Sequence, residues 1–174
     1  MKIAIIGYSG SGKSTLARHL GQYYDCQPIH LDKLHFSSGW HERNNQEMSN
    51  DLSPILQKEQ WNIEGNYNQC LYEERMMLAD RIIFLNGQRF YCLWRVFKRY
   101  LAFHNKTRPD MADNCPERFD LNFIKWILWD GRTMKRKKNY LSVKHQYPQK
   151  LITLKNQKEI DLFLKTITQK DNHY

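Results

Sequence analysis

The sequence of 174 residues lacks features that mark several large classes of protein. It contains no run of about eighteen apolar residues, which excludes a transmembrane helix. Its beginning, Met1 to Ile6, lacks the charged region, the long apolar stretch and the small-residue cleavage site of a secretory signal. We therefore expect a cytoplasmic protein.

Cysteine is scarce, and its positions argue against two further kinds of site. The four cysteines form no Cys-x-x-Cys pair, whereas metal sites and thioredoxin-like redox motifs usually need close spacing. In the absence of an export signal, we expect reduced thiols in buried positions. The seven histidines show no spacing typical of metal ligands, so we assign none of them to catalysis. The cysteines are Cys26, Cys70, Cys92 and Cys115.

Hydrophobic residues make up 41% of the chain and aromatic residues 13%, which excludes wholesale disorder. Lysine and arginine exceed aspartate and glutamate by nine, and this favours an anionic partner such as a nucleotide or a nucleic acid. The excess is local. Residues 89–150 hold fifteen basic and five acidic residues, and the rest of the chain is nearly neutral.

Short apolar segments alternate with segments of helical periodicity along the chain. The apolar segments are four or five residues long, which is typical of parallel strands buried on both faces. We predict an α/β fold of three layers, in which helices cover both faces of a parallel sheet. The expected strands are 2–6, 28–31, 61–64, 81–85 and 151–154, and the expected helices are 14–24, 53–59, 90–104, 121–129, 133–144 and 160–167.

The gap between the fourth and fifth expected strands is too long for a simple crossover. We predict a single domain over residues 1–174, with residues 89–149 as a helical insertion or lid. Within the insertion, residues 108–116 are expected to form a loop, since prolines near both ends forbid a regular helix. Trp94, Trp126 and Trp129 lie at helical spacings there, which favours core packing.

Residues 7–14 match the phosphate-loop pattern G-x-x-x-x-G-K-[ST] in full. The glycines let the backbone turn tightly and direct N–H groups around an anion, and the following helix adds its positive end. Lys13 is placed to reach the β- and γ-phosphates, and the Ser14 hydroxyl is placed to bind Mg²⁺. We predict that the chain binds ATP. The expected nucleotide-binding residues are Gly7, Ser9, Gly10, Ser11, Gly12, Lys13, Ser14 and Thr15.

A phosphate loop serves many classes of protein, and the rest of the sequence narrows the choice. GTPases usually read guanine with an Asn-Lys-x-Asp segment, but Asn105-Lys106-Thr107-Arg108 ends in the wrong charge. The Leu-Ser-Gly-Gly-Gln stretch of transport ATPases is also missing. These two absences favour a kinase that uses ATP.

Two carboxylates, Asp32 and Glu64, end the second and third expected strands, at the sheet edge where α/β proteins place their chemistry. Glu64 is positioned to hold the Mg²⁺ hydration shell, as a Walker-B carboxylate does. Asp32 is positioned to accept a proton from an acceptor hydroxyl or to orient it. His30 and His35 flank Asp32 and are candidates for contact with an acceptor. The alternative for both carboxylates is a capping role at the next helix or turn.

A series of motifs from Lys2 to about Trp129 resembles the bacterial DNA topology modulation protein family, which is similar to adenylate kinase and related small P-loop kinases. The motifs that carry the resemblance are Gly7-Tyr-Ser-Gly-Ser-Gly-Lys-Ser-Thr15, His30-Leu-Asp-Lys-Leu-His-Phe36, Gly39-Trp40, Trp61-Asn-Ile-Glu-Gly-Asn-Tyr67, Ala79-Asp-Arg-Ile-Ile-Phe-Leu85, Cys92-Leu-Trp-Arg-Val-Phe-Lys-Arg99, Arg108-Pro-Asp-Met111 and Cys115-Pro-Glu117.

The resemblance implies a five-stranded parallel sheet in the order 2-3-1-4-5 with a mobile lid after the fourth strand. The segment from Glu64 to Tyr67 resembles the Asp-Gly-Phe-Pro-Arg segment of adenylate kinases, which implies Mg²⁺ binding by Glu64 and acceptor contact near Asn66. The final arginine of that segment is replaced by Asn68, which argues against adenosine monophosphate as the acceptor. Asp32 resembles the acceptor-side aspartate of shikimate- and gluconate-type kinases.

Phosphoryl transfer needs cations around the migrating group, and the insertion supplies candidates. Arg95 and Arg99 are four residues apart and share a helix face, and we assign them to catalysis. Arg89 and Arg108 are expected to contact the nucleotide once the lid closes. The alternative is that these arginines form a solvated basic face.

The segment between the second and third strands is the expected acceptor side. There, Trp40 is a candidate for stacking on a ring and Arg43 for clamping an anion. A partly buried tryptophan beside an exposed arginine is the equally weighted alternative.

Three functions remain open at this stage. The leading one is a kinase that uses ATP and Mg²⁺ on an unidentified small acceptor. The second is a nucleic-acid-binding ATPase or regulator, in which the basic run Arg132–Lys138 contacts the backbone and Tyr140 and Tyr147 stack on bases. The third is a protein that binds ATP only as a structural or signalling ligand. We expect no membrane partner.

Overall fold

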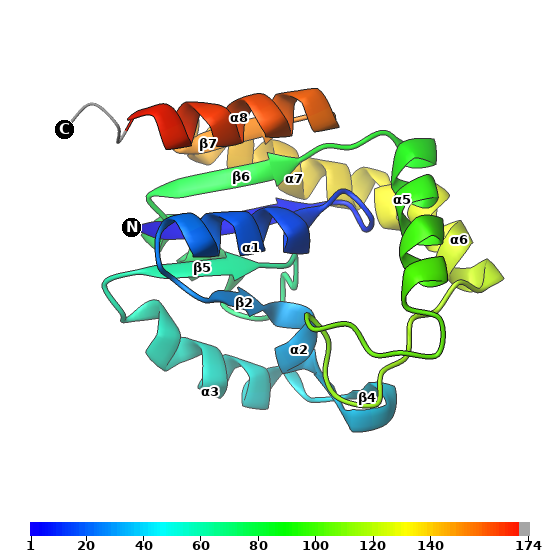
Figure 1. The fold of residues 1–174 in the computed structure, drawn as a ribbon. Coiled ribbons are helices and arrows are strands. Elements are labelled where there is room, and N and C mark those ends of the chain that lie inside the picture. The colour runs from blue at the N-terminus through cyan, green and yellow to red at the C-terminus, as the bar shows by residue number, and fades with distance from the viewer. Residues whose placement is uncertain (171–174) are drawn as a thin grey trace.

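The computed structural model describes residues 1–170, in which a five-stranded parallel sheet lies between two layers of helices (Figure 1). The sheet order is β2 (Pro28–His30), β5 (Trp61–Glu64), β1 (Lys2–Gly7), β6 (Arg81–Leu85) and β7 (Leu151–Leu154). Numbered among themselves, these strands follow the order 2-3-1-4-5. The predicted α/β fold class is therefore confirmed, and the last four residues of the predicted domain lie outside the described residues.

Two apolar cores cover the two faces of the sheet, because alternate side chains of β1 point in opposite directions. Ile3 and Ile5 pack with α1 (Lys13–Tyr23) and α8 (Gln157–Lys170). Ala4 and Ile6 belong to the other core, which includes side chains of α3 (Asn45–Leu56), α4 (Tyr72–Leu78) and α7 (Met134–Gln146). The parallel strands thus bring their carboxyl ends to one edge, beside α5 (Arg89–Ala102) in Figure 1.

The segment before β5 differs most from the expectation. The helix expected at 53–59 begins at Asn45, because the Asn44 side chain accepts a hydrogen bond from the Glu47 N–H at 2.8 Å and caps it. Strand β2 ends at His30, so Asp32 lies in the short helix α2 (Leu31–His35).

Some other elements were not predicted, and one helix begins earlier than its predicted start. A hairpin, β3 (Phe36–Ser37) and β4 (His41–Glu42), closes through the 3₁₀ turn η1 (Ser38–Trp40). Helix α4 was not expected, and α8 starts three residues earlier than the predicted 160.

The predicted insertion contains α5, α6 (Leu121–Leu128), the 3₁₀ turn η2 (Asp130–Arg132) and α7. Between α5 and α6, Thr107 pairs with Pro116 in an isolated bridge, and we call residues 107–117 the lid loop. That this loop moves as a lid stays a prediction. Among the described helices, none has the length and apolar character needed to cross a membrane.

Candidate functional site

The phosphate loop connects β1 to α1 and lies against α5. Gly10 has a φ of 76°, and a Cβ placed there would lie 2.5 Å from the Cys92 carbonyl oxygen of α5. Gly12 has a φ of 104°, and its missing Cβ leaves room for the Arg95 guanidinium, whose Nη2 would lie 2.8 Å from that Cβ. Both positions therefore require glycine.

Two side chains hold the backbone around this loop. Asn66 accepts a hydrogen bond from the Gly7 N–H at 3.0 Å and donates to the Gly7 carbonyl at 2.8 Å. Asn66, predicted to contact the acceptor, is thus engaged with the loop backbone, because its amide matches both backbone polar groups of one residue, Gly7. Lys13 Nζ donates to the Tyr8 carbonyl at 3.2 Å and stays within the loop.

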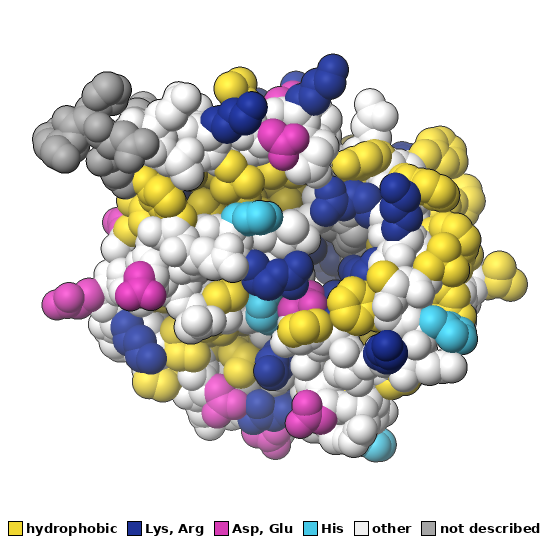
Figure 2. Space-filling view, in the orientation of Figure 1, with side chains coloured by type: hydrophobic (Ala, Val, Ile, Leu, Met, Phe, Trp, Pro, Cys, Tyr) yellow, Lys and Arg dark blue, Asp and Glu magenta, His cyan; other side chains and the backbone are white. Residues whose placement is uncertain are grey.

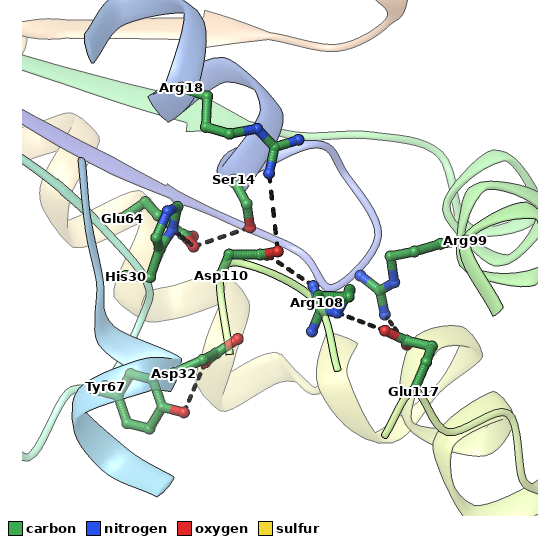
Figure 3. Close-up of polar contacts among 10 residues, drawn as sticks. All are labelled: Ser14, Arg18, His30, Asp32, Glu64, Tyr67, Arg99, Arg108, Asp110 and Glu117. Atoms are coloured by element: carbon green, nitrogen blue, oxygen red, sulfur yellow. Dashed lines mark hydrogen bonds and ion pairs between the residues drawn. The ribbon is translucent and has the colours of Figure 1, made fainter. Parts of the chain in front are cut away.

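Glu64 lies at the carboxyl end of β5 and shares one oxygen between two donors. The Ser14 hydroxyl donates to Glu64 Oε1 at 2.9 Å, and His30 Nδ1 lies 2.9 Å from the same oxygen (Figure 3). The Glu64 side chain is only 3% exposed. The structure therefore brings together the two residues predicted to bind Mg²⁺, and it adds His30 to them.

Asp110 reaches this group from the lid loop, although sequence reasoning assigned it no role. Its carboxylate lies 2.8 Å from Arg108 and 3.8 Å from Arg18 of α1 (Figure 3). Burial alone would raise the pKa of the Asp110 carboxyl, but Arg108 and the neighbouring Ser14 hydroxyl outweigh burial and hold that pKa below its usual range. The only sequence signal near Asp110 is the Arg108-Pro-Asp motif. The motif alone does not show that this loop lies beside the phosphate loop.

Asp32, the predicted acceptor-side carboxylate, lies in α2 and is half-buried. The Tyr67 hydroxyl donates to Asp32 Oδ1 at 2.7 Å, and no described residue hydrogen-bonds to Oδ2. Burial, with the nearby negative charge of Asp32, raises the pKa of Tyr67, so this phenol stays a donor. The Tyr67 ring packs on His35 with centroids 4.7 Å apart, which fixes the pair in place.

The predicted arginines surround the same edge of the sheet. Arg99 lies 2.7 Å from Glu117, and Arg108 forms an ion pair with the same carboxylate. Burial and the neighbouring Arg108 lower the pKa of Arg99. Arg95 donates to Gln157 Oε1 at 2.6 Å beside the phosphate loop, whereas Arg89 is exposed at the start of α5. Figure 2 shows Lys and Arg side chains gathered around a recess between α1 and α5.

Arg43 and Trp40, both predicted to bind the acceptor, are engaged by other groups of the protein. Arg43 donates to Asp51 at 2.8 Å and to the Leu34 carbonyl at 3.1 Å, so α3 and α2 use its guanidinium. Trp40 packs with Phe36 against the lid loop, and its indole donates to the Pro116 carbonyl at 3.3 Å. Local carboxylates and apolar surface thus compete successfully for these side chains.

The basic run Arg132–Lys138 is not one exposed surface. Arg132 is buried, and its guanidinium lies 3.8 Å from the centroid of the Tyr8 ring and donates to the Gly87 carbonyl at 2.9 Å. Arg136 stacks on Trp126 at 4.4 Å. Arg132 is therefore not available to a nucleic acid, whereas Lys135 and Lys138 are exposed and Arg136 and Lys137 are partly exposed.

The core packing expected of three tryptophans is also wrong. Trp94 is 51% exposed and Trp129 is 58% exposed, and Trp126 is exposed by 36%. Helices α5 and α6 meet through Cys92, Val96 and Ile127 instead. Helical spacing therefore did not indicate which face of each helix is covered.

Comparison with models of known protein families finds no match, and no curated protein matches the sequence. The resemblance to the DNA topology modulation family is therefore not confirmed. Solved structures do match the fold. A shikimate kinase from Acinetobacter baumannii in complex with shikimate aligns over 99% of this chain and 93% of its own, with 16% identity and a TM-score of 0.63.

Two further kinases share the fold at similar distance. A gluconokinase from Sinorhizobium meliloti 1021 aligns over 99% of this chain and 95% of its own, with 13% identity and a TM-score of 0.54. A deoxyadenosine kinase from M. mycoides with bound dATP aligns over 97% and 99%, with 14% identity and a TM-score of 0.51. The chain therefore has the fold of small P-loop kinases.

Proposed function

We propose that the protein is a phosphotransferase that moves the γ-phosphoryl group of ATP to a hydroxyl or phosphate group of a small acceptor. The observation that carries this proposal is the position of Asp32 and of the phosphate loop at one edge of the sheet, with Ser14 and Glu64 between them. The similar fold of small-molecule kinases supports it.

The donor set of the site fits Mg²⁺. A buried carboxylate and a hydroxyl are hard oxygen ligands, which Mg²⁺ prefers, and Ser14 and Glu64 would hold the ion. When bound, the ion neutralises charge on the phosphate oxygens. Lys13, Arg95, Arg99 and Arg108 are the cations proposed to orient and stabilise the triphosphate.

Asp32 is the proposed base for a hydroxyl acceptor. The acceptor oxygen forms a bond to the γ-phosphorus, the bond to the β–γ bridging oxygen breaks, and ADP leaves. The acceptor proton passes to Asp32 Oδ2, because Tyr67 already donates to Oδ1. Tyr67 is a positioning residue in this scheme, since it contacts Asp32 rather than the acceptor.

An acceptor screen that follows ADP formation tests the proposal. The panel contains hydroxy acids, sugar acids, nucleosides and nucleoside monophosphates, since the structural neighbours act on shikimate, gluconate and deoxyadenosine. Lys13→Ala is expected to lower turnover by about 100-fold or more, because it removes a cation at the developing charge. Lys165→Ala, on the exposed face of α8, is the matched control and keeps full turnover.

Asp32→Asn separates the acceptor step from nucleotide binding. It is expected to lower kcat with the acceptor by about 100-fold while the affinity for ATP is unchanged. Equal turnover by wild type and Lys13→Ala with every acceptor contradicts the mechanism. Tight ATP binding with no acceptor consumed would support the purely structural use of ATP instead.

A further inference from the structure

We propose that Asp110 of the lid loop is a third oxygen ligand of a divalent cation, together with Ser14 and Glu64, and that the site binds the cation before any nucleotide. The proposal rests on the proposed function only for the place of the metal beside the phosphate loop. It assigns to this chain a metal site completed by the lid loop, so that metal binding and closure of the loop stabilise each other.

The first argument is that Glu64 has no lysine or arginine partner, and that its one potential ionic partner in the described residues is the His30 imidazole, 2.9 Å away. The Glu64 side chain is 3% exposed, and no lysine or arginine of the described residues lies within 4.0 Å of it. Both of its hydrogen bonds end on Oε1, so Oε2 has no hydrogen-bond partner in residues 1–170. A buried carboxylate that has one imidazole and one hydroxyl as its only partners is costly, and a bound divalent cation lowers that cost.

The second argument is the convergence of ligands from three separate elements. Ligand atoms of His30, Glu64 and Asp110 all lie within 4.8 Å of one another, and Ser14 bonds to Glu64 in the middle (Figure 3). An octahedral ion about 2.1 Å from its ligands places them roughly 3 to 4.2 Å apart. Small movements of side chains are therefore enough to bring the three oxygens around one ion.

The third argument is the burial of the Asp110 carboxylate. The residue is 5% exposed, although it lies in a loop between α5 and α6. Arg108 and Arg18 attract its carboxylate, but Glu64 repels it across the same small space. A divalent cation between the two carboxylates converts that repulsion into attraction. His30 Nδ1 meanwhile orients Glu64 Oε1.

A titration with Mn²⁺ in the absence of nucleotide tests the site, with free Mn²⁺ followed by electron paramagnetic resonance. Wild type is expected to bind one ion. Asp110→Asn and Ser14→Ala are expected to bind it about tenfold more weakly or worse, since each removes an oxygen ligand. Asp113→Asn is the matched control, because Asp113 is an exposed carboxylate of the same loop and should leave binding unchanged.

Hydrogen exchange gives a second readout, in which wild type is compared with and without Mn²⁺ and the comparison is repeated in Asp110→Asn. Mn²⁺ is expected to slow exchange of the amides in residues 107–117 by several-fold, because an ion that binds the closed loop stabilises it. In Asp110→Asn, Mn²⁺ should leave these rates unchanged. Wild type that binds no Mn²⁺, or Asp110→Asn that binds it as tightly as wild type, overturns the proposal.

Failure of this inference is distinguishable from failure of the proposed function. If an acceptor is phosphorylated while Asp110→Asn keeps full affinity for Mn²⁺, Asp110 only anchors the loop through Arg108 and Arg18, and the metal proposal alone falls. If Mn²⁺ binds through Asp110 but no acceptor consumes ATP, the metal site stands and the phosphotransferase proposal falls.

Discussion

Arg75 is a completely buried arginine of α4 that holds the backbone next to Glu64. Its guanidinium donates to the carbonyls of Gly65, Asn66 and Tyr67 at 3.1 to 3.2 Å. Burial lowers its pKa to about 10. Hydrogen bonds to three successive carbonyls replace the lost hydration, so one side chain fixes the position of the residues that follow β5.

Tyr72, one turn before Arg75, gives a prediction at this scale. Its hydroxyl is buried with no hydrogen-bond partner in the described residues, and burial raises its pKa to about 12. Tyr72→Phe removes an unsatisfied polar group, so we expect the free energy of unfolding at pH 7 to rise by about 1 kcal/mol. Urea unfolding followed by circular dichroism measures it.

The same variant should change the response to alkali. The Tyr72 phenol loses its proton near pH 10 in the unfolded chain and near pH 12 in the folded one, so it binds more protons when folded in that window. The free energy of unfolding of wild type, relative to that of Tyr72→Phe, is therefore constant below pH 10. It falls as the pH rises toward 12, by about 1.4 kcal/mol per pH unit at most. Identical alkaline slopes for wild type and Tyr72→Phe would contradict this assignment.

Residue roles were predictable from the sequence only where the chemistry is local. The residues of the phosphate loop follow one another, and Glu64 ends a recognisable strand, so spacing was sufficient to propose them. The contacts of Asp110 and Arg75 depend on how loops bring distant segments together, and hydrophobic periodicity does not predict the path of a loop. Asn66 and Arg43 were assigned to an acceptor because the sequence does not show that Gly7 and Asp51 engage their side chains.

At the scale of elements, the hairpin β3–β4 is bound to the lid loop. Trp40 and Phe36 pack against Met111, Ala112 and Cys115. The Trp40 backbone N–H donates to Cys115 Sγ at 3.3 Å, and the Gly39 N–H donates to the Asp113 carbonyl at 3.3 Å. The hairpin β3–β4 and the lid loop are thereby joined by one small apolar cluster, although Trp40 and Cys115 are 75 residues apart in the chain.

We expect Trp40→Ala to release the lid loop while the sheet stays intact. The variant loses the apolar contact and the indole hydrogen bond to Pro116, so the loop should open more often. Trypsin is expected to cleave after Lys106 and Arg118 several-fold faster, as peptide mapping by mass spectrometry would show. Trp129→Ala, at an exposed position outside this cluster, is the control. Equal cleavage rates for the two variants would show that the cluster does not restrain the loop.

The order of the elements was more accessible from sequence than their contacts. Apolar runs identified every strand of the main sheet, since each is buried on both faces. The hairpin β3–β4 has only two residues in each strand, too few for a period to appear. Its attachment to the lid loop depends on tertiary packing alone.

At the scale of the whole molecule, basic and apolar surfaces divide the predicted insertion. Figure 2 shows hydrophobic side chains along the side formed by α5 and α6, next to the basic recess. The basic excess of residues 89–150 therefore serves several ends: Arg108 and Arg132 are buried, while Lys135, Lys137 and Lys138 lie on α7. A count of charges cannot separate these uses, because burial depends on the fold.

The exposed tryptophans should contribute little to stability. Trp94→Gln and Trp129→Gln are each expected to change the free energy of unfolding by no more than about 0.5 kcal/mol, since each side chain is more than half exposed. Trp61→Ala, at a position only 1% exposed, should cost about 3–5 kcal/mol. Urea denaturation of the three variants makes the comparison. A loss of several kcal/mol in Trp94→Gln would mean that α5 depends on this side chain.

Trp126 makes one of the contacts between the insertion and the phosphate loop. Its indole N–H donates to Ser9 Oγ at 3.2 Å, and the Arg136 guanidinium covers its ring. The wavelength of indole fluorescence depends on the polarity and hydrogen bonding around the ring, and an anion bound by the loop would change both. Trp126 is one of five tryptophans, and its indole bonds to the phosphate loop, so in a variant that keeps only this tryptophan its fluorescence would report occupancy of the loop without any attached dye.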